Sequence, residues 1–328
     1  MNTALERSTR FRELIARQEG LSVMGVRDAY DAKVLEAEGA EGIYAGGFAA
    51  AASFGELDQG LYHDHMIRHG RRIASKVGIP VMLDMDDGGV SVRNIERNLT
   101  DVLETAPIGG FHVEDQEGHR CGHHGGKKVH EFKMAVARMK CVADVRDKVR
   151  PDCFFLARTD AFVAAGHAHD EKAGGDIDEC IRRVKAYIDV GADGAWCEFN
   201  GTRLFHAYEK LAEAVQKHKP GFPLAFNITP SKEWYPDSVS FERLNQLGYK
   251  FLFCTYGALQ AQAVATAMFY RDFKINGHHS LAGLQGRMKM FPRIQSVNTL
   301  LGIKEATAFE EAYDPTAEER FRTSEGHR

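Results

Sequence analysis

The sequence predicts an α/β protein, namely a (β/α)8 (TIM) barrel followed by a C-terminal helical extension. Eight short apolar or β-branched runs recur along the chain, and stretches with helical patterning lie between most of them. Alternation of strands and helices indicates parallel strands joined by right-handed crossovers, and eight such units favour a closed barrel. The alternative is an open doubly wound sheet, which calls for a glycine-rich phosphate-binding turn after an early strand. Gly46 and Gly47, at the second run, are too slight a signal for such a turn.

The candidate strands recur through the first 255 residues. They are residues 21–26, 42–46, 79–84, 110–114, 153–158, 194–198, 223–227 and 250–255. Helices are predicted at residues 28–39, 178–190, 241–247 and 258–273. Residues 115–129 show no apolar periodicity, and loops of this length in compact domains are usually functional or disordered. We expect the barrel to occupy residues 1–275 and a helical tail to occupy residues 276–328.

Composition narrows the class of protein. Of the 328 residues, 44% are hydrophobic and 27% are charged, as in ordinary soluble proteins. A net charge of −4 argues against a nucleic-acid partner. No apolar run approaches the roughly 18 residues that span a bilayer, and residues 1–17 lack the apolar segment of a secretory signal. We therefore expect a cytoplasmic protein without nucleic-acid or membrane partners, whose six cysteines are reduced thiols.

Most of the candidate strands end in a polar or charged residue. After the first strand, the terminal residues are Gly46, Asp84, Glu114, Arg158, Glu198, Asn227 and Thr255. The carboxyl ends of the strands in a parallel barrel meet at one face, and that face holds the active site of barrel enzymes. Any one of these residues could be polar simply because strands end in loops. Six polar ends out of seven favour a shared site instead.

Carboxylates cluster after the third and fourth candidate strands. Asp84, Asp86 and Asp87 lie in one short segment, and Glu114 and Asp115 close the next strand. Clustered carboxylates repel one another unless a cation lies among them, and hard oxygen ligands favour Mg2+ or Mn2+. The alternative assigns some of these acids to helix capping and salt bridges. It fits Asp87 or Asp115 best.

The loop at residues 117–128 holds a thiol among cationic side chains. Cys121 follows an arginine and precedes His123, with glycines on both sides of the group. Neighbouring cations lower the pKa of a thiol from about 8.5 and make it a usable acid or nucleophile. A zinc site formed by Cys121 with His119, His123 and His124 is the alternative, but its spacing matches no standard zinc framework. We expect a lid that carries a reactive cysteine.

Anion-binding side chains follow the later strands. The candidates are Arg158, Asn227, Thr229, Ser231 and Thr255. A cation together with a row of neutral hydrogen-bond donors suits a carboxylate ligand. Serine and threonine near a turn are by themselves usually turn formers, so Arg158 is the strongest member of this group.

Together the motifs resemble the isocitrate lyase/phosphoenolpyruvate mutase superfamily, over nearly all of residues 20–275. The most specific match is His-Val-Glu-Asp-Gln at residues 112–116 followed by Arg-Cys-Gly-His at residues 120–123. Weaker matches are Tyr-Ala-Gly-Gly-Phe at 44–48, Ser-Phe-Gly-Glu-Leu-Asp at 53–58, Leu-Asp-Met-Asp at 83–86 and Ala-Arg-Thr-Asp-Ala at 157–161. The segment at 227–234 is similar to that of isocitrate lyases in particular.

The resemblance implies a Mg2+-dependent lyase, with Mn2+ as the other candidate metal, that cleaves isocitrate to glyoxylate and succinate by retro-aldol chemistry. It implies that Asp84 binds the metal directly, and that Asp58, Asp86 and Glu114 bind it through water. Roles in the reaction itself are implied for Cys121, which would protonate the succinate carbanion, and for His123, Arg158, Glu198 and Tyr44. Contacts to a small di- or tricarboxylate substrate are implied for Gly46, Gly47, Phe48, Gly122, Trp196, Asn227, Thr229, Ser231 and Thr255. A homotetramer that exchanges C-terminal helices between subunits is implied as well.

Two departures from the family pattern leave the substrate open. Gly46 and Phe48 stand where isocitrate lyases usually have Ser and Trp. The resemblance implies that the smaller Phe48 slightly enlarges the pocket beside the aldehyde product, which could then admit an extra methyl group. The helical insertion typical of isocitrate lyases is absent. The first alternative is therefore 2-methylisocitrate lyase, which forms pyruvate and succinate. Cleavage or decarboxylation of another 2-hydroxy or 2-oxo diacid is the second, and a non-catalytic metabolite-binding homologue is the third.

Overall fold

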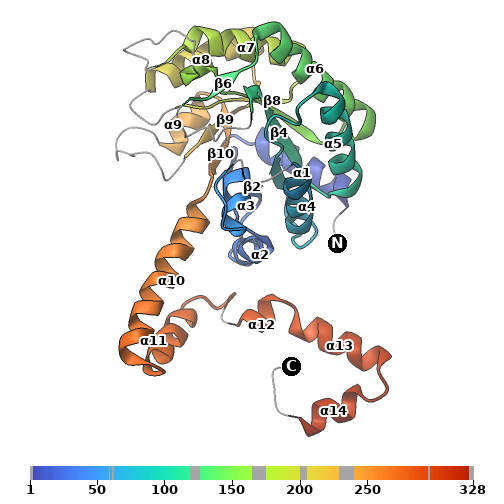
Figure 1. Ribbon diagram of the computed structural model, residues 1–328, viewed down its shortest axis with the longest axis vertical. Helices are drawn as coiled ribbons and strands as arrows, with labels where there is room; N and C mark the ends of the chain where they lie inside the picture. The colour runs from blue at the N-terminus through green and yellow to red at the C-terminus, as the bar shows by residue number, and fades with distance from the viewer. Residues whose placement is uncertain are drawn as a thin grey trace. The chain divides into compact units, whose positions relative to one another are not determined.

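The computed structural model describes residues 3–58, 60, 63–118, 126–164, 175–199, 205–228, 240–294 and 296–324 (Figure 1). The chain forms two compact units, one of residues 1–32 with 40–260 and the other of residues 33–39 with 261–328. The first unit contains the main sheet, and the second is helical where it is described. The predicted division at residue 275 and the exchange of the tail between subunits stay predictions.

Eight parallel strands form the barrel, one in each of the predicted runs. They are β1 (Leu21–Met24), β2 (Ile43–Ala45), β3 (Val81–Asp84), β4 (Gly110–Glu114), β7 (Phe154–Thr159), β8 (Gly194–Cys197), β9 (Leu224–Asn227) and β10 (Tyr249–Cys254). Their order around the sheet is β1-β10-β9-β8-β7-β4-β3-β2. The two ends of this order meet at a parallel bridge between Gly25 and Tyr44, where the Val26 N–H donates to the Tyr44 carbonyl oxygen over 2.9 Å. The predicted (β/α)8 barrel is confirmed.

Helices follow the strands, and α4 to α8 lie side by side on the outside of the barrel (Figure 1). The helices of the first unit are α1 (Ala4–Ala16), α2 (Ala29–Ala37, whose end belongs to the second unit), α3 (Gly47–Ser53), α4 (His63–Ala74), α5 (Val92–Thr105), α6 (Phe132–Val149), a 3-10 turn (Ala161–Val163), α7 (Ile177–Asp189), α8 (Phe205–His218) and α9 (Phe241–Gln246). The C-terminal extension consists of α10 (Gly257–Asn276), α11 (His279–Met288), α12 (Val297–Leu300), α13 (Ile303–Tyr313) and α14 (Ala317–Thr323). No described helix is both long enough and apolar enough to cross a membrane.

Helix α1 closes the amino end of the barrel. Its buried side chains recur every three to four residues, at Arg7, Phe11 and Leu14. The Phe11 ring packs edge-on against Phe154 and Phe251, with centroids 5.3 and 5.7 Å away. The Arg7 guanidinium is buried as well and donates to backbone carbonyl oxygens of the loops around it. Apolar side chains therefore fill this end of the barrel, and the candidate pocket opens at the carboxyl ends of the strands.

The segment at residues 115–129 contains a short hairpin that the sequence analysis does not predict. Strands β5 (Gln116–Glu117) and β6 (Lys128–Val129) pair antiparallel, with Gln116 opposite Val129. Each strand has two residues, which is too few for an alternating pattern to be visible in the sequence. The expectation of a wholly irregular loop is therefore wrong at its two ends, while residues 119–125 lie outside the described part of the chain.

Candidate active site

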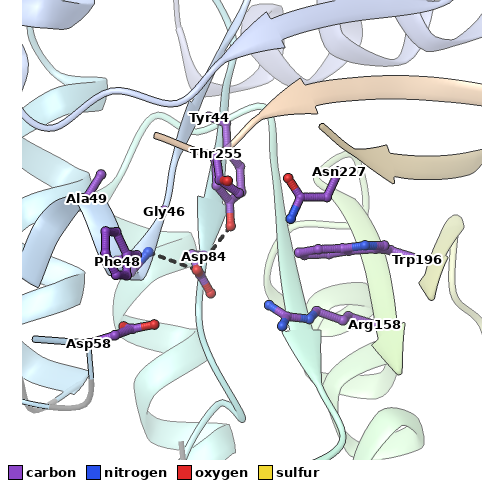
Figure 2. Close-up of a pocket in the computed structure, with 11 residues that line it drawn as sticks. Tyr44, Gly46, Phe48, Ala49, Asp58, Asp84, Arg158, Trp196, Asn227 and Thr255 are labelled. Atoms are coloured by element: carbon purple, nitrogen blue, oxygen red, sulfur yellow. Dashed lines mark hydrogen bonds between the residues drawn. The ribbon is translucent and has the colours of Figure 1, made fainter. Parts of the chain in front are cut away.

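A pocket opens at the carboxyl ends of the barrel strands (Figure 2). Its cavity volume is about 30 Å³, more than the roughly 10–15 Å³ that one water molecule requires. The residues that line it are Tyr44, Gly46, Gly47, Phe48, Ala49, Asp58, Asp84, Arg158, Trp196, Asn227 and Thr255. All but Ala49 belong to the set predicted from the sequence, so residues far apart in the chain converge on one cavity.

Asp84 accepts hydrogen bonds through both of its carboxylate oxygens. Its Oδ2 accepts hydrogen bonds from the Tyr44 hydroxyl over 3.1 Å and from the Gly47 N–H over 2.8 Å. Its Oδ1 accepts from the Asp86 N–H over 2.9 Å. Burial by itself would raise the pKa of Asp84, but the neighbouring His112, the positive charge of Arg158 and the two N–H donors lower it below its usual value. Asp84 is therefore held as a carboxylate.

Asp86 lies close to Asp84 and is in the opposite electrostatic situation. A Cβ atom on Gly47 would lie 3.1 Å from Asp86 Oδ1 and 3.3 Å from Asp84 Oδ2, so both carboxylates border the same small space. Burial, followed by the negative charges of Asp84, Asp58 and Asp87, raises the pKa of Asp86 well above its usual value. A crowd of acids of this kind is what a hard divalent cation would stabilise.

The donor set fits a magnesium-type ion but does not form a complete cage. Within the described ranges, no three His, Cys, Asp or Glu side chains converge as a ready-made metal site. Magnesium usually takes one or two carboxylates and retains several waters. Asp84 and Asp86, with Asp58 on the same side of the pocket (Figure 2), match that requirement.

Arg158 holds the opposite side of the pocket. Its Nη1 lies 2.7 Å from Glu114 Oε2, and its Nη2 lies 3.1 Å from Asp160 Oδ2. The guanidinium carbon stands 4.1 Å from the centre of the Trp196 ring, in a cation–π contact. Its Nε has no hydrogen-bond partner within the described part of the chain. The guanidinium is therefore fixed in orientation and retains a free N–H donor.

Glu114 lies against Arg158, and no hydrogen bond joins it to Asp84 or Asp86 among the described contacts. Burial raises the pKa of Glu114 well above its usual value, although the Arg158 charge opposes that effect. Its predicted part in water-mediated metal binding stays a prediction.

Further donors and acceptors follow the later strands. The Asn227 amide nitrogen lies 3.3 and 3.4 Å from the two oxygens of the buried Glu198 carboxylate. The Trp196 Nε1 and Thr255 Oγ1 atoms are buried without a hydrogen-bond partner in the described residues. Buried donors of this kind normally have a partner, which here would be water or a ligand.

The turn at Gly46 to Phe48 lies beside Asp84. Gly47 donates its N–H to Asp84, so this N–H is engaged within the protein. The Phe48 ring packs against the Tyr256 ring with centroids 4.7 Å apart. Gly46 precedes α3 and closely approaches the Tyr44 ring. The predicted contacts of these three residues with substrate stay predictions.

Two acids serve the scaffold, as the alternative interpretation of the acidic cluster suggests. The Asp87 carboxylate accepts from the Gly89 N–H over 2.8 Å and lies 3.7 Å from the Arg138 guanidinium. Asp115 accepts from Arg183 over 3.0 Å and from the Tyr187 hydroxyl over 2.6 Å.

His112 lies at the site, although it was not among the residues predicted from the sequence. Its Nε2 lies 3.0 Å from the Tyr44 hydroxyl and 3.3 Å from Asp84 Oδ1. Burial lowers its pKa to about 4, against the opposing effect of Asp84, so the imidazole is neutral near pH 7. A signal was available, because alternate residues of a strand share a face. That rule places His112 on the side of Glu114 in β4.

Five predicted site residues lie outside the described part of the chain. They are Cys121, Gly122, His123, Thr229 and Ser231. The described residues on either side of the first three are Gly118 and Gly126.

The geometry defines a (β/α)8 barrel with a polar pocket at the carboxyl ends of its strands. Residues 11–272 match the phosphoenolpyruvate phosphomutase family. An isocitrate lyase of Haloferax volcanii is 29% identical, over 98% of this chain and 91% of its own. A 2-methylisocitrate lyase of Shewanella oneidensis is 34% identical, over 74% and 83%. The crystal structure of a 2,3-dimethylmalate lyase matches the whole chain with a TM-score of 0.79 at 23% identity, which speaks for the fold alone.

The chain belongs to the phosphoenolpyruvate phosphomutase family, within the PEP mutase/isocitrate lyase superfamily. It is an enzyme of the lyase class, as are the relatives named above. The membership inferred from the motifs is confirmed.

Proposed function

We propose that this lyase cleaves the carbon–carbon bond of a 2-hydroxy tricarboxylate, with isocitrate as the substrate and glyoxylate and succinate as the products. The supporting observation is the division of one pocket into a carboxylate side, at Asp58 and Asp84, and a cationic side, at Arg158. Similarity to the Haloferax isocitrate lyase over nearly the full chain supports the same assignment.

The carboxylate side would hold Mg2+ or Mn2+. Asp84 and Asp86 are the residues best placed to hold it, with Asp58 and Glu114 contributing through water. When bound, such a cation polarises the substrate hydroxyl and the neighbouring carboxylate and lowers the barrier to loss of the hydroxyl proton.

The cationic side would bind substrate carboxylate. Arg158 points into the pocket (Figure 2), with its orientation held by Trp196 and by two carboxylates. A guanidinium fixed in advance stabilises negative charge that develops as the bond breaks, without reorganising at that moment. We assign the succinate-side carboxylate to Asn227 and Thr255, together with Thr229 and Ser231.

Proton movement completes the reaction. The hydroxyl oxygen loses a proton and becomes the carbonyl oxygen of glyoxylate, while the electrons of the broken bond pass to the carbon of succinate. We assign delivery of a proton to that carbon to Cys121, with His123 and Glu198 adjusting its acidity. Tyr44 faces the hydroxyl in this proposal. Burial, and next the Asp84 charge, raises the pKa of Tyr44 well above 10, so it works as a hydrogen-bonded relay toward His112 and Asp84.

A methylated substrate is the second candidate. Phe48 lines the pocket in the place of a larger aromatic residue, and the Shewanella 2-methylisocitrate lyase is 34% identical to this chain. One methyl group changes discrimination by only about 1–3 kcal/mol, so a single pocket residue can reverse the preference.

The test measures products directly. Purified protein with Mg2+ is incubated with isocitrate and, separately, with 2-methylisocitrate, and glyoxylate and pyruvate are quantified. A higher kcat/KM for isocitrate supports the proposal. A higher kcat/KM for 2-methylisocitrate favours the second candidate instead. If neither compound is cleaved, both candidate functions are refuted.

A further inference from the structure

Lys127 is a buried lysine beside the active site, with only 2% of its surface exposed. Its Nζ lies 3.1 Å from Asp160 Oδ1, and the Asp160 side chain is completely buried. Taking an ammonium and a carboxylate out of water is costly, and a buried pair often adds little stability over apolar residues of similar volume. The pair therefore calls for an explanation other than stability.

Asp160 connects Lys127 with the pocket. Its Oδ2 accepts a hydrogen bond from Gln116 Nε2 over 2.8 Å and lies 3.1 Å from Arg158 Nη2. Burial would raise the pKa of Asp160, but the Arg158 and Lys127 charges outweigh burial and hold it well below its usual value. Asp160 is thus a carboxylate shared between two cations, one of which faces the ligand pocket.

Both arms of the β5–β6 hairpin converge on this carboxylate. Gln116 belongs to β5, and Lys127 directly precedes β6. The chain between these arms contains Cys121. Asp160 therefore joins the base of the cysteine-bearing segment to the arginine of the pocket.

We propose that Lys127 is a positioning residue that, through Asp160, keeps Arg158 available to a substrate carboxylate. The inference deepens the proposed function and rests on its assignment of carboxylate binding to Arg158. The sharing of Asp160 gives the reason. Its carboxylate pairs with both Lys127 and Arg158. Without Lys127, the negative charge of Asp160 would act on Arg158 alone, and Asp160 would compete with the substrate for Arg158.

The test uses Lys127→Met, which keeps the length of the side chain and removes its charge. Affinities for oxalate and succinate are measured by calorimetry in the presence of Mg2+, and KM and kcat are measured with isocitrate. A unit charge roughly 10 Å away, at an effective dielectric constant of about 20, changes an affinity by about tenfold. We expect dicarboxylate affinity to fall and KM to rise by about that factor.

The double variant Lys127→Met/Asp160→Asn distinguishes positioning from a structural role. It also removes the negative charge of Asp160, so we expect it to bind oxalate more tightly than Lys127→Met alone. A structural role predicts that the second substitution causes a further loss.

Arg146→Met is the matched control. Arg146 is a buried cation that pairs with Asp193 near the amino end of β7, the strand that carries Arg158 at its other end. This variant should lose stability while its dicarboxylate affinity remains unchanged.

Three outcomes overturn the inference: wild-type affinity in Lys127→Met, no recovery in the double variant, or no binding of either anion by the wild-type protein. Failure of the proposed function is a separate result, because it appears as absence of isocitrate cleavage while the anion affinities remain measurable.

Discussion

Replacing Gly46 with alanine should disturb the active site through Tyr44. A Cβ atom at position 46 would lie 2.4 Å from Cε1 and 3.1 Å from Cζ of the Tyr44 ring. Carbon atoms in contact are normally about 3.5–4.0 Å apart, so the ring would have to move by about 1 Å. Serine, which is usual here in isocitrate lyases, would introduce the same Cβ.

The surroundings of Tyr44 resist that movement. The buried ring stacks on His112 and packs against Phe253 with centroids 4.7 Å apart, and its hydroxyl donates to Asp84. Overpacking costs about 1–3 kcal/mol, and a hydrogen bond to a charged group contributes about 1.5–3 kcal/mol. We expect Gly46→Ala to lower the free energy of unfolding by about 2–5 kcal/mol, and kcat/KM by about 10²-fold, as for other displacements of about 1 Å.

Denaturant unfolding and steady-state kinetics measure both effects. Repeating the substitution in a Tyr44→Leu variant tests whether the clash with the Tyr44 ring is their cause. In Tyr44→Leu, which lacks the ring atoms, adding Gly46→Ala should reduce stability by less than about 1 kcal/mol. The steric explanation is refuted if Gly46→Ala is as stable as the wild type. It is also refuted if Gly46→Ala lowers the free energy of unfolding equally with and without the Tyr44 ring.

Three further predictions concern the reaction and the scaffold. Cys121→Ser should lower kcat by about 10²–10⁴-fold while substrate still binds, because a general acid contributes that much; near-normal turnover would remove this assignment. EDTA should abolish turnover, and Mg2+ should restore it; full activity in EDTA would rule out a metal requirement. Arg7→Met should lower the free energy of unfolding by about 2–4 kcal/mol, because buried carbonyl acceptors lose their donor. The exposed control Arg10→Met should change it by less than about 1 kcal/mol, and equal effects would contradict the burial argument.

The barrel was predictable because most of its strands are buried on both faces. Such strands appear in the sequence as apolar runs, and every predicted run overlaps one observed strand. Helix α1 was missed because its buried face includes Arg7, which looks like a surface residue in the sequence. The partners of the Arg7 guanidinium are backbone carbonyl oxygens far away in the sequence, and no local sequence pattern indicates them.

The pocket was predictable in outline and less so in its pairings. Strand ends identify which side chains reach the same face, and this placed Asp84, Arg158 and Asn227 around one cavity. Spacing along the chain does not reveal which acid pairs with which cation. Glu114 therefore appeared as part of a metal site, whereas its closest described charge partner is Arg158.

The closure of the barrel has a consequence for the chemistry. Tyr44 accepts a backbone hydrogen bond from Val26 where the first and last strands of the sheet order meet, and its side chain reaches Asp84 from the same position. One residue therefore takes part both in the closure of the barrel and in the lining of the candidate pocket. Separation of the two strands at this bridge would also move the Tyr44 hydroxyl away from Asp84.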